Sequence, residues 1–357
     1  MKKNNQSLTL PQPELAKNTV IAIKHLIEKN DLSQKEAFDA MEEIMRGTAS
    51  HSQIAAFLVA LRLKGEKVVE ITGLVQSMIK HAQMIKPKNP WVVDTCGTGG
   101  DLSNTFNIST AVAFLATAAG VTVAKHGNRA ISSHCGSADV LEALGANIDL
   151  TPAQVKKCID TCGLGFMFAP VFHPAMKNVG PVRREIKIRT VFNILGPLSN
   201  PASAKAQLIG VFHPDLTSLM CRVLRNLGVK HAMVVHGAEG LDEISITHRT
   251  KITELKNDSI TSYVVTPEMF HLQTGSHAQI MGGSASTNAH ILKQILSGKE
   301  HSCRSDIVIF NTAAVLMLGK KAEKFKDGIE IAREVLYSGK ALEKMKNFVD
   351  YTRSLKK

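Results

Sequence analysis

WVVDTCGTGGDLSNTFNISTAVAFLATAAGVTVAKHGNRAISSHCGSADVLEALG, residues 91–145, is the stretch that decides the fold. It alternates short apolar runs, polar glycine-rich turns and helix-like runs. Residues 92–93 and 121–124 predict strands, because they are short, apolar and β-branched. Residues 109–119 and 137–144 predict helices, and a glycine follows each of them. This alternation is typical of βαβ units in a mostly parallel sheet.

Three polar turns in this stretch favour a phosphate-bearing ligand. They cover residues 97–101, residues 107–110, and residues 125–133 with 136–139. Each lies where a strand-like run meets a helix-like run, so backbone N–H groups and a helix dipole favour an anion there. Three such turns favour a ligand with more than one phosphate. The ATP-type motif Gly-x-x-x-x-Gly-Lys-Ser/Thr does not occur in the sequence.

Each of these turns also has a purely structural interpretation. The glycines can serve only a tight turn, and residues 107–110 can serve only as a helix cap. Capping needs one Asn, Ser or Thr, whereas three occur within four positions, which favours phosphate contacts. The Ser109 hydroxyl can also bind a hard cation, and Lys125 can supply a point charge. For His126 a structural role is favoured over that of a general base.

Two charged clusters lie later in the chain. Asp242 and Glu243 follow a glycine-containing loop, and at a turn both carboxylates can reach one Mg²⁺. Arg183 and Arg184 lie in a Pro- and Gly-flanked segment, and a guanidinium pairs well with an acidic substrate. The alternative for the arginines is a surface salt-bridge cluster with Glu185.

Helical and strand periodicity extends the prediction to the rest of the chain. Residues 14–83 read as four short helices, with a capping box from Ser33 to Glu36. The apolar stripe between Val20 and Ile79 serves either the core of this bundle or a dimer interface. Strands are predicted at residues 166–168, 207–212 and 232–235, and a helix at 216–227. Residues 250–265 predict an antiparallel excursion, and the chain from residue 307 onward predicts helices.

Composition limits the functional class. A chain of 357 residues predicts two domains, and 43 basic against 31 acidic residues give a formal charge of +12. That excess fits nucleic acid or a site for small polyanions, but one Trp and three Tyr offer little for base stacking. The start lacks a secretory signal, and the most apolar run, residues 111–124, is too short to cross a membrane. Six cysteines fit reduced thiols in the cytoplasm.

Taken together, the motifs resemble the anthranilate phosphoribosyltransferase family, which acts in tryptophan synthesis. The matching strings, in family order, are residues 97–101, 107–110, 125–133, 136–145, 168–170, 173–177, 181–184, 189–193, 195–198 and 242–245. The resemblance implies an α/β fold: a small N-terminal helical bundle that forms a homodimer, and a larger α/β domain whose mostly parallel sheet is flanked by helices. It implies a helical domain at 14–87 with a return segment at about 174–197, and an α/β domain at 88–173 and 198–357.

The resemblance also assigns site residues. Those implied to hold 5-phosphoribosyl 1-diphosphate are Gly97, Gly100, Asp101, Thr105, Asn107, Ile108, Ser109, Thr110, Lys125, His126, Gly127, Asn128, Arg129, Ala130, Ile131, Ser132, Ser133 and Ser137. Those implied to touch anthranilate are Gly97, Asn128 and Arg183. Two Mg²⁺ ions per subunit are implied at Ser109, Asp242 and Glu243, and catalytic roles fall to Lys125, Asp242 and Glu243. His134-Cys135 and His248-Arg249 depart from the family's usual residues without replacing a matched ligand.

The implied reaction is attack of the anthranilate amine on ribose C1 as diphosphate leaves. Two other functions stay open from the sequence. One is a pyrimidine nucleoside phosphorylase, which resembles this family in architecture and would use phosphate and a nucleoside. The other is a non-catalytic nucleic-acid-binding relative, for which the net charge is the support and the retained pair Asp242-Glu243 the counter-argument.

Overall fold

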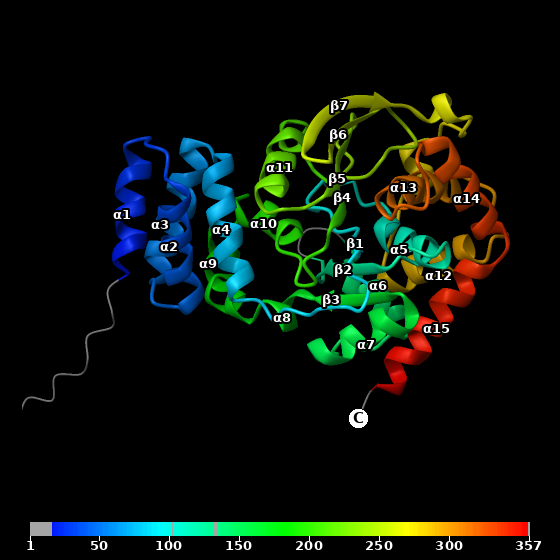
Figure 1. Cartoon of the computed structure of the whole chain (residues 1–357), viewed down its shortest axis with the longest axis horizontal. Coiled ribbons are helices and arrows are strands. Elements are labelled where there is room, and N and C mark those ends of the chain that lie inside the picture. The colour runs from blue at the N-terminus through cyan, green and yellow to red at the C-terminus, as the bar shows by residue number, and fades with distance from the viewer. Residues whose placement is uncertain (1–15, 102, 131–133, 356–357) are drawn as a thin grey trace, which may run out of the picture. The chain divides into compact units, whose positions relative to one another are not determined.

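A computed structural model describes residues 16–101, 103–130 and 134–355 (Figure 1). The chain divides into two compact units, one of residues 1–81 with 175–191 and one of residues 82–174 with 192–357. We propose these units as the two domains expected from the sequence, and positions 14 and 15 of the expected helical domain lie outside the described residues.

The first unit is a helical bundle. Its helices are α1 (Lys17–Ile27), α2 (Gln34–Arg46), α3 (His51–Lys64), α4 (Val68–Lys80) and α9 (Gly180–Ile186). The capping box at the start of α2 is confirmed: Ser33 Oγ accepts from the Glu36 N–H at 3.2 Å, and Glu36 Oε2 accepts from the Ser33 N–H at 2.8 Å. The return segment packs back on the bundle, because Asn178 Nδ2 donates to the Met45 carbonyl at 2.9 Å.

The second unit is built on a seven-stranded sheet in the order β3-β2-β1-β4-β5-β6-β7. Its strands are β1 (Val93–Asp94), β2 (Val123–Gly127), β3 (Leu164–Phe168), β4 (Ala206–Gly210), β5 (His231–Gly237), β6 (Thr250–Lys256) and β7 (Ser259–Val265). The first five are parallel, and β6 and β7 are antiparallel additions. The predicted parallel sheet and the antiparallel excursion at 250–265 are both confirmed.

The helices of this unit pack on both faces of the sheet and on one another. They are α5 (Ile108–Ala118), α6 (Ser137–Leu144), α7 (Pro152–Cys162), α8 (Ala169–Phe172), α10 (Phe192–Leu198), α11 (Asp215–Asn226), α12 (Ala285–Leu296), α13 (Cys303–Leu318), α14 (Phe325–Tyr337) and α15 (Lys340–Ser354). Short 3₁₀ turns occur at Pro174–Asn178, Pro267–Phe270 and His277–Ile280. In Figure 1, α5, α12 and α13 lie on one side of the sheet and α11 on the other.

The core of the second unit lies between the sheet and helices α5 and α13. Both helices are buried on nearly all sides, which explains why neither sequence shows a clear polar face. The Phe114 and Phe348 rings meet edge to face, with centroids 5.8 Å apart. All six cysteines are free thiols, as the sequence predicts. Among the described residues, none of the helices is both long and apolar enough to cross a bilayer.

Candidate functional site

The candidate site lies where the strand order reverses. Strand β1 pairs with β2 on one side and with β4 on the other. The turn that follows β1 crosses the end of β4, because the Thr98 N–H donates to the Gly210 carbonyl at 2.9 Å. Ligands of open α/β sheets bind outside the carboxyl ends of the strands at such a reversal. The glycine-rich turn therefore sits where the topology offers a binding site.

The turn joins a segment that is far away in the sequence. Gly99 and Gly100 have φ angles of 63° and 75°, a left-handed conformation that favours glycine. The Gly99 N–H donates to Asp242 Oδ2 at 2.8 Å. Asp101 Oδ2 accepts from the Ser103 hydroxyl and, at 3.5 Å, from the Asp242 N–H. The structure thus brings three predicted site residues, Gly97, Asp101 and Asp242, to one place: an added Cβ at Gly97 would lie 3.0 Å from Asp242 Oδ2.

Gly210 fixes the backbone of the acidic segment. An added Cβ at this residue would lie 1.5 Å from the Asp242 carbonyl oxygen, far inside van der Waals contact. Only glycine fits there, so the last residue of β4 sets how closely the segment approaches the sheet. Asp242 and Glu243 belong to the irregular connection between β5 and β6, which lets neighbouring carboxylates face the same site.

The carboxylates of this segment repel one another. Burial and the neighbouring Asp101 raise the pKa of Asp242, and burial and Asp242 raise the pKa of Glu243. Lys125 and a hydrogen bond from the Ser109 backbone act in the opposite direction on Glu243. Negative charge is therefore concentrated here beyond what the nearby groups compensate, and a cation would be stabilised.

The donor set fits Mg²⁺ when substrate oxygens complete it. The described residues hold no cluster of three or more His, Cys, Asp or Glu arranged as a metal site. Mg²⁺ commonly binds one or two carboxylates and takes its other ligands from water and substrate phosphates. Asp242 and Glu243 supply two such carboxylates. The Ser109 hydroxyl accepts from Lys125 Nζ at 3.0 Å, so a cation at this hydroxyl would compete with the ammonium.

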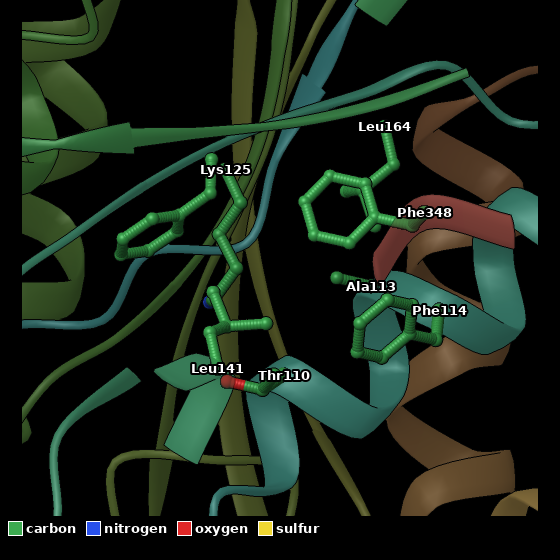
Figure 2. Close-up of a pocket in the computed structure, with 8 residues that line it drawn as sticks. Thr110, Ala113, Phe114, Lys125, Leu141, Leu164 and Phe348 are labelled. Atoms are coloured by element: carbon green, nitrogen blue, oxygen red, sulfur yellow. The ribbon is translucent and has the colours of Figure 1, made fainter. Parts of the chain in front are cut away.

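Lys125 is buried and fully hydrogen-bonded. Its Nζ donates to the Thr95 carbonyl at 3.0 Å, to Thr95 Oγ1 at 3.2 Å and to Ser109 Oγ. All three ammonium protons are used, so its charge acts on the site at a distance or after a rearrangement. Figure 2 shows the Lys125 stem running past a small cavity toward Leu141 and Thr110. That cavity measures about 10 Å³ and has an apolar lining, so it is a packing void behind the site.

The first N–H groups of α5 already have acceptors, because the Ile108 N–H donates to the Phe106 carbonyl at 2.7 Å and the Thr110 N–H to the Asn107 carbonyl at 3.1 Å. Asn107 precedes the helix but does not cap it with its side chain. Instead Asn107 Nδ2 donates to the Cys135 carbonyl at 3.0 Å, and its Oδ1 accepts from Asn288 Nδ2 at 2.9 Å. The simple capping interpretation of Asn107 is wrong, because the amide ties the α5 turn to residue 135 and to α12. Thr110 Oγ1 is buried, and none of the residues that the structure describes forms a hydrogen bond with it.

Two acidic residues for which the sequence predicted no role, Asp139 and Glu142, hydrogen-bond to the segment after β2. Asp139 Oδ2 accepts from the Ala130 N–H at 2.9 Å and from the Gly136 N–H at 2.8 Å. The Arg129 guanidinium donates to Asp139 and Glu142, and these bonds raise its pKa. Arg129 therefore stabilises the conformation of the turn, and its charge is already paired with these two carboxylates. The sequence did contain a signal for this contact. Asp139 is the third residue of α6, three positions after Gly136, where an acidic side chain accepts from the N–H groups before the helix.

The other residues that the resemblance implies for the donor lie in this turn and at two further places. Ser137 Oγ donates to the Asn128 carbonyl at 3.3 Å, and an added Cβ at Gly127 would lie 2.3 Å from that hydroxyl. Thr105 forms an isolated bridge with Met281, which places it beside the segment before α12. Ile108 lies in the buried first turn of α5. Ile131, Ser132 and Ser133 lie outside the described residues.

His126 is a neutral, buried ring. Burial and the neighbouring His173 lower its pKa to about 3, and the two ring centroids lie 5.0 Å apart. Its Nδ1 lies 3.2 Å from the Gly196 carbonyl, whereas Nε2 is buried and has no hydrogen-bond partner among the described residues. A neutral imidazole offers a ligand a hydrogen bond and no charge.

Asp94 is a buried carboxylate at the end of β1 that supports the site. It accepts from Asn200 Nδ2 at 2.6 Å and from the His126 N–H at 3.1 Å, and Asn200 also donates to the Ala124 carbonyl at 3.0 Å. These bonds hold the ends of β1 and β2 together. Burial raises the pKa of Asp94 to about 6.

This burial predicts a pH effect on stability. A carboxyl whose pKa is raised by folding binds its proton more tightly in the folded chain, so its contribution to stability falls as pH rises from about 4 to about 6. The quantity to compare is the difference in the free energy of unfolding between the wild type and Asp94→Asn. We expect this difference to fall by at most about 3 kcal/mol across this window and then to level off. Urea unfolding at four pH values measures it. Asp215→Asn, at an exposed site, is the control, and a difference for Asp94→Asn that is flat across the window would contradict the assignment.

The arginine pair lies in the first unit, on α9. Arg183 is partly buried, and burial lowers its pKa, while Arg184 is exposed. A desolvated guanidinium is stabilised by an anionic partner. The two arginines therefore differ in environment even though they are adjacent, and Arg183 is the better candidate for binding an acid.

Comparisons with known proteins agree with this architecture. Residues 89–342 match the a/b domain of a glycosyl transferase family, and residues 20–82 match its helical bundle domain. The chain is 51% identical over 333 residues to the anthranilate phosphoribosyltransferase of Acetivibrio thermocellus, covering 93% of this chain and 96% of that protein.

Solved structures give the same picture. The crystal structure of anthranilate phosphoribosyltransferase from Thermus thermophilus matches with a TM-score of 0.89 and 40% identity, covering 93% of this chain and 99% of that one. The Saccharomyces cerevisiae enzyme in complex with PRPP and Mg matches with a TM-score of 0.87 and 29% identity, covering 95% and 98%.

Proposed function

Because the chain belongs to the anthranilate phosphoribosyltransferase family, we propose that it transfers the 5-phosphoribosyl group of 5-phosphoribosyl 1-diphosphate to the amine of anthranilate. It is an enzyme of the pentosyltransferase class. The products are N-(5-phosphoribosyl)anthranilate and diphosphate, and the step belongs to tryptophan synthesis. The observation that carries the proposal is the contact of the glycine-rich turn with Asp242 at the strand reversal.

The geometry supports a donor that carries several phosphates. The turn at Gly99, the start of α5 and the turn after β2 all belong to the second unit, and the positive end of the α5 dipole favours an anion there. We assign to this site the donor residues implied by the sequence, including Ile131, Ser132 and Ser133. Arg129 is assigned a shaping role within that set, since its guanidinium pairs with Asp139 and Glu142.

We assign Mg²⁺ to Asp242 and Glu243, with Ser109 as a further ligand and two ions per subunit. The related yeast enzyme was solved in complex with PRPP and Mg. When bound, Mg²⁺ supplies positive charge to the leaving diphosphate. The crowding of Asp242, Glu243 and Asp101 supports this assignment, because a cation relieves their repulsion.

The chemistry is a displacement at ribose C1. The anthranilate nitrogen forms a bond to C1, the C1–O bond to diphosphate breaks with its electron pair, and the amine then loses a proton to water. An arylamine gives up this proton easily once bonded to carbon, so the site needs no strong base and a neutral His126 is compatible. Lys125 adds a fixed positive field for the departing charge. We assign acceptor contacts to Gly97, Asn128 and Arg183.

Anthranilate fluorescence tests the proposed reaction directly. Purified protein with the donor and Mg²⁺ should consume anthranilate fluorescence with release of diphosphate. No consumption under these conditions, combined with phosphorolysis of thymidine by free phosphate, would overturn the proposal in favour of a nucleoside phosphorylase.

We further propose that the enzyme is a cytoplasmic homodimer, with its interface on the helical unit. The six free thiols suit a reducing compartment. Exposed apolar side chains on that unit, Ile21, Ile27, Leu63 and Val69, support an interface. Light scattering at micromolar protein should give twice the 38.7 kDa of one chain, and Leu63→Glu with Ile27→Glu should lower the mass. A wild type that is monomeric under these conditions would contradict the dimer.

A further inference from the structure

A second hollow lies at the opposite end of the sheet from the candidate site. It has a volume of about 680 Å³ and is lined by Trp91, Lys230, His231, Lys256, Asn257, Met317, Lys320, Lys321, Ala322, Glu323 and Asp327. Trp91 precedes β1, and Lys230 precedes β5, so the hollow is at the amino ends of these strands. The glycine-rich turn follows the carboxyl end of β1. The two places are therefore separate.

The hollow carries an excess of positive charge over carboxylates. Four lysines line it, at positions 230, 256, 320 and 321, against two carboxylates, Glu323 and Asp327. Within the described residues, the salt bridges do not include any of these four ammonium groups. The one imidazole of the lining, His231, is already bonded to Glu254 at 2.7 Å. A multivalent anion would neutralise this local excess.

Lys320 ends helix α13 at the edge of the hollow. Its φ angle is 60°, the left-handed conformation of a Schellman helix end, in which the Lys321 N–H donates to the Leu316 carbonyl at 2.8 Å. The Lys320 Nζ lies 3.3 Å from the centre of the Trp91 ring, and the indole N–H donates to the Leu318 carbonyl at 2.9 Å. This helix end places the Lys320 ammonium group over the Trp91 ring, and both residues line the hollow.

We propose that this hollow binds a compact phosphate polyanion, up to the size of a nucleotide, at a site distinct from the donor site. The lining has lysines and no arginine, and lysine binds phosphate as a compact point charge. The volume lies in the range of small-molecule sites. Trp91 and Met317 provide an apolar surface for an attached base or sugar. This binding goes beyond the transferase reaction.

The chain contains one tryptophan, so its fluorescence reports on this hollow. Sodium tripolyphosphate and ATP would be titrated into the full-length protein at constant ionic strength, with EDTA to remove Mg²⁺. We expect a saturable change in emission as Lys320 moves from the Trp91 ring toward phosphate. Equal affinities for the two probes would assign binding to phosphate alone, and tighter binding of ATP would add a contact to the nucleoside. Either result supports the proposal.

Two double charge-reversal variants test whether the anion binds in this hollow. They distinguish binding there from general electrostatic attraction and from binding at the donor site. Lys256→Glu with Lys321→Glu should weaken binding by about 4–25-fold, because each exposed ion pair accounts for about twofold to fivefold and two are lost. Lys293→Glu with Lys346→Glu changes the net charge equally at exposed positions away from the hollow and should leave binding unchanged. Both variants should keep transferase activity. A signal that persists in the first variant, falls equally in both, or is absent from the wild type would overturn the proposal. Tighter binding of a single-stranded oligonucleotide than of either probe would also overturn it.

Discussion

The variant Asp242→Asn with Glu243→Gln should lose turnover by on the order of a thousandfold at millimolar Mg²⁺, because both proposed metal carboxylates are neutralised. The double substitution keeps the shape of both side chains, and the Gly99 N–H can still donate to the amide oxygen that takes the place of Asp242 Oδ2 in the variant. Initial rates with saturating substrates measure the loss. Wild-type rates in this variant would exclude the metal assignment.

Stability provides the second readout on the same variant. Burial and mutual repulsion raise the pKa values of both acids, so in the absence of Mg²⁺ their charged forms oppose folding at neutral pH. The neutral variant should therefore unfold at the same temperature as the wild type or higher, and Mg²⁺ should shift its melting curve less. Asp215→Asn with Glu334→Gln, at exposed positions of the same unit, controls for the change in net charge.

Arg183→Ala should lower kcat/KM for anthranilate by about 10–100-fold and leave donor binding nearly unchanged. A charge-assisted hydrogen bond accounts for roughly 1.5–3 kcal/mol, and about 1.4 kcal/mol is tenfold in rate. The partly buried guanidinium supports this role, because its charge is desolvated before any substrate arrives. Arg183→Lys should recover only part of the loss, since an ammonium group lacks the planar fork that matches a carboxylate.

Arg184→Ala is the matched control, one position along the same helix and exposed. It should change neither the anthranilate kinetics nor the melting temperature appreciably. If both arginines instead belonged to a structural ion-pair cluster, each alanine variant would melt earlier with unchanged kinetics. Normal anthranilate kinetics in Arg183→Ala would show that the acceptor assignment is wrong.

Most of the fold could be predicted from local sequence patterns. The helices of the bundle, the alternation after Trp91 and the antiparallel strands at 250–265 all follow from periodicity and turn residues close together in sequence. Side-chain partners were harder to predict. Asn107 reads as a cap but bonds to residue 135 and to Asn288, 181 positions away. Arg129 reads as a phosphate ligand, yet Asp139 and Glu142 already pair with it.

The candidate site shows the same limit. The sequence predicts the glycine-rich turn and the acidic pair separately, from their compositions. It does not predict that the Gly99 N–H binds Asp242 or that Gly210 must lack a side chain for this approach. The supporting pair Asp94 and Asn200 is also non-local, 106 positions apart. Contacts of this range depend on strand order, which local patterns do not encode.

The bond between Gly99 and Asp242 spans 143 positions, and it has a consequence for biosynthesis. During translation the glycine-rich turn leaves the ribosome long before the acidic segment exists, so a nascent chain can build its helical bundle and first strands without the proposed metal ligands. Long-range pairings of this kind also form slowly. A cell therefore gains catalytic capacity only from finished chains, and truncated products that carry the glycine-rich turn alone would lack the acidic segment that our proposal needs to consume the donor.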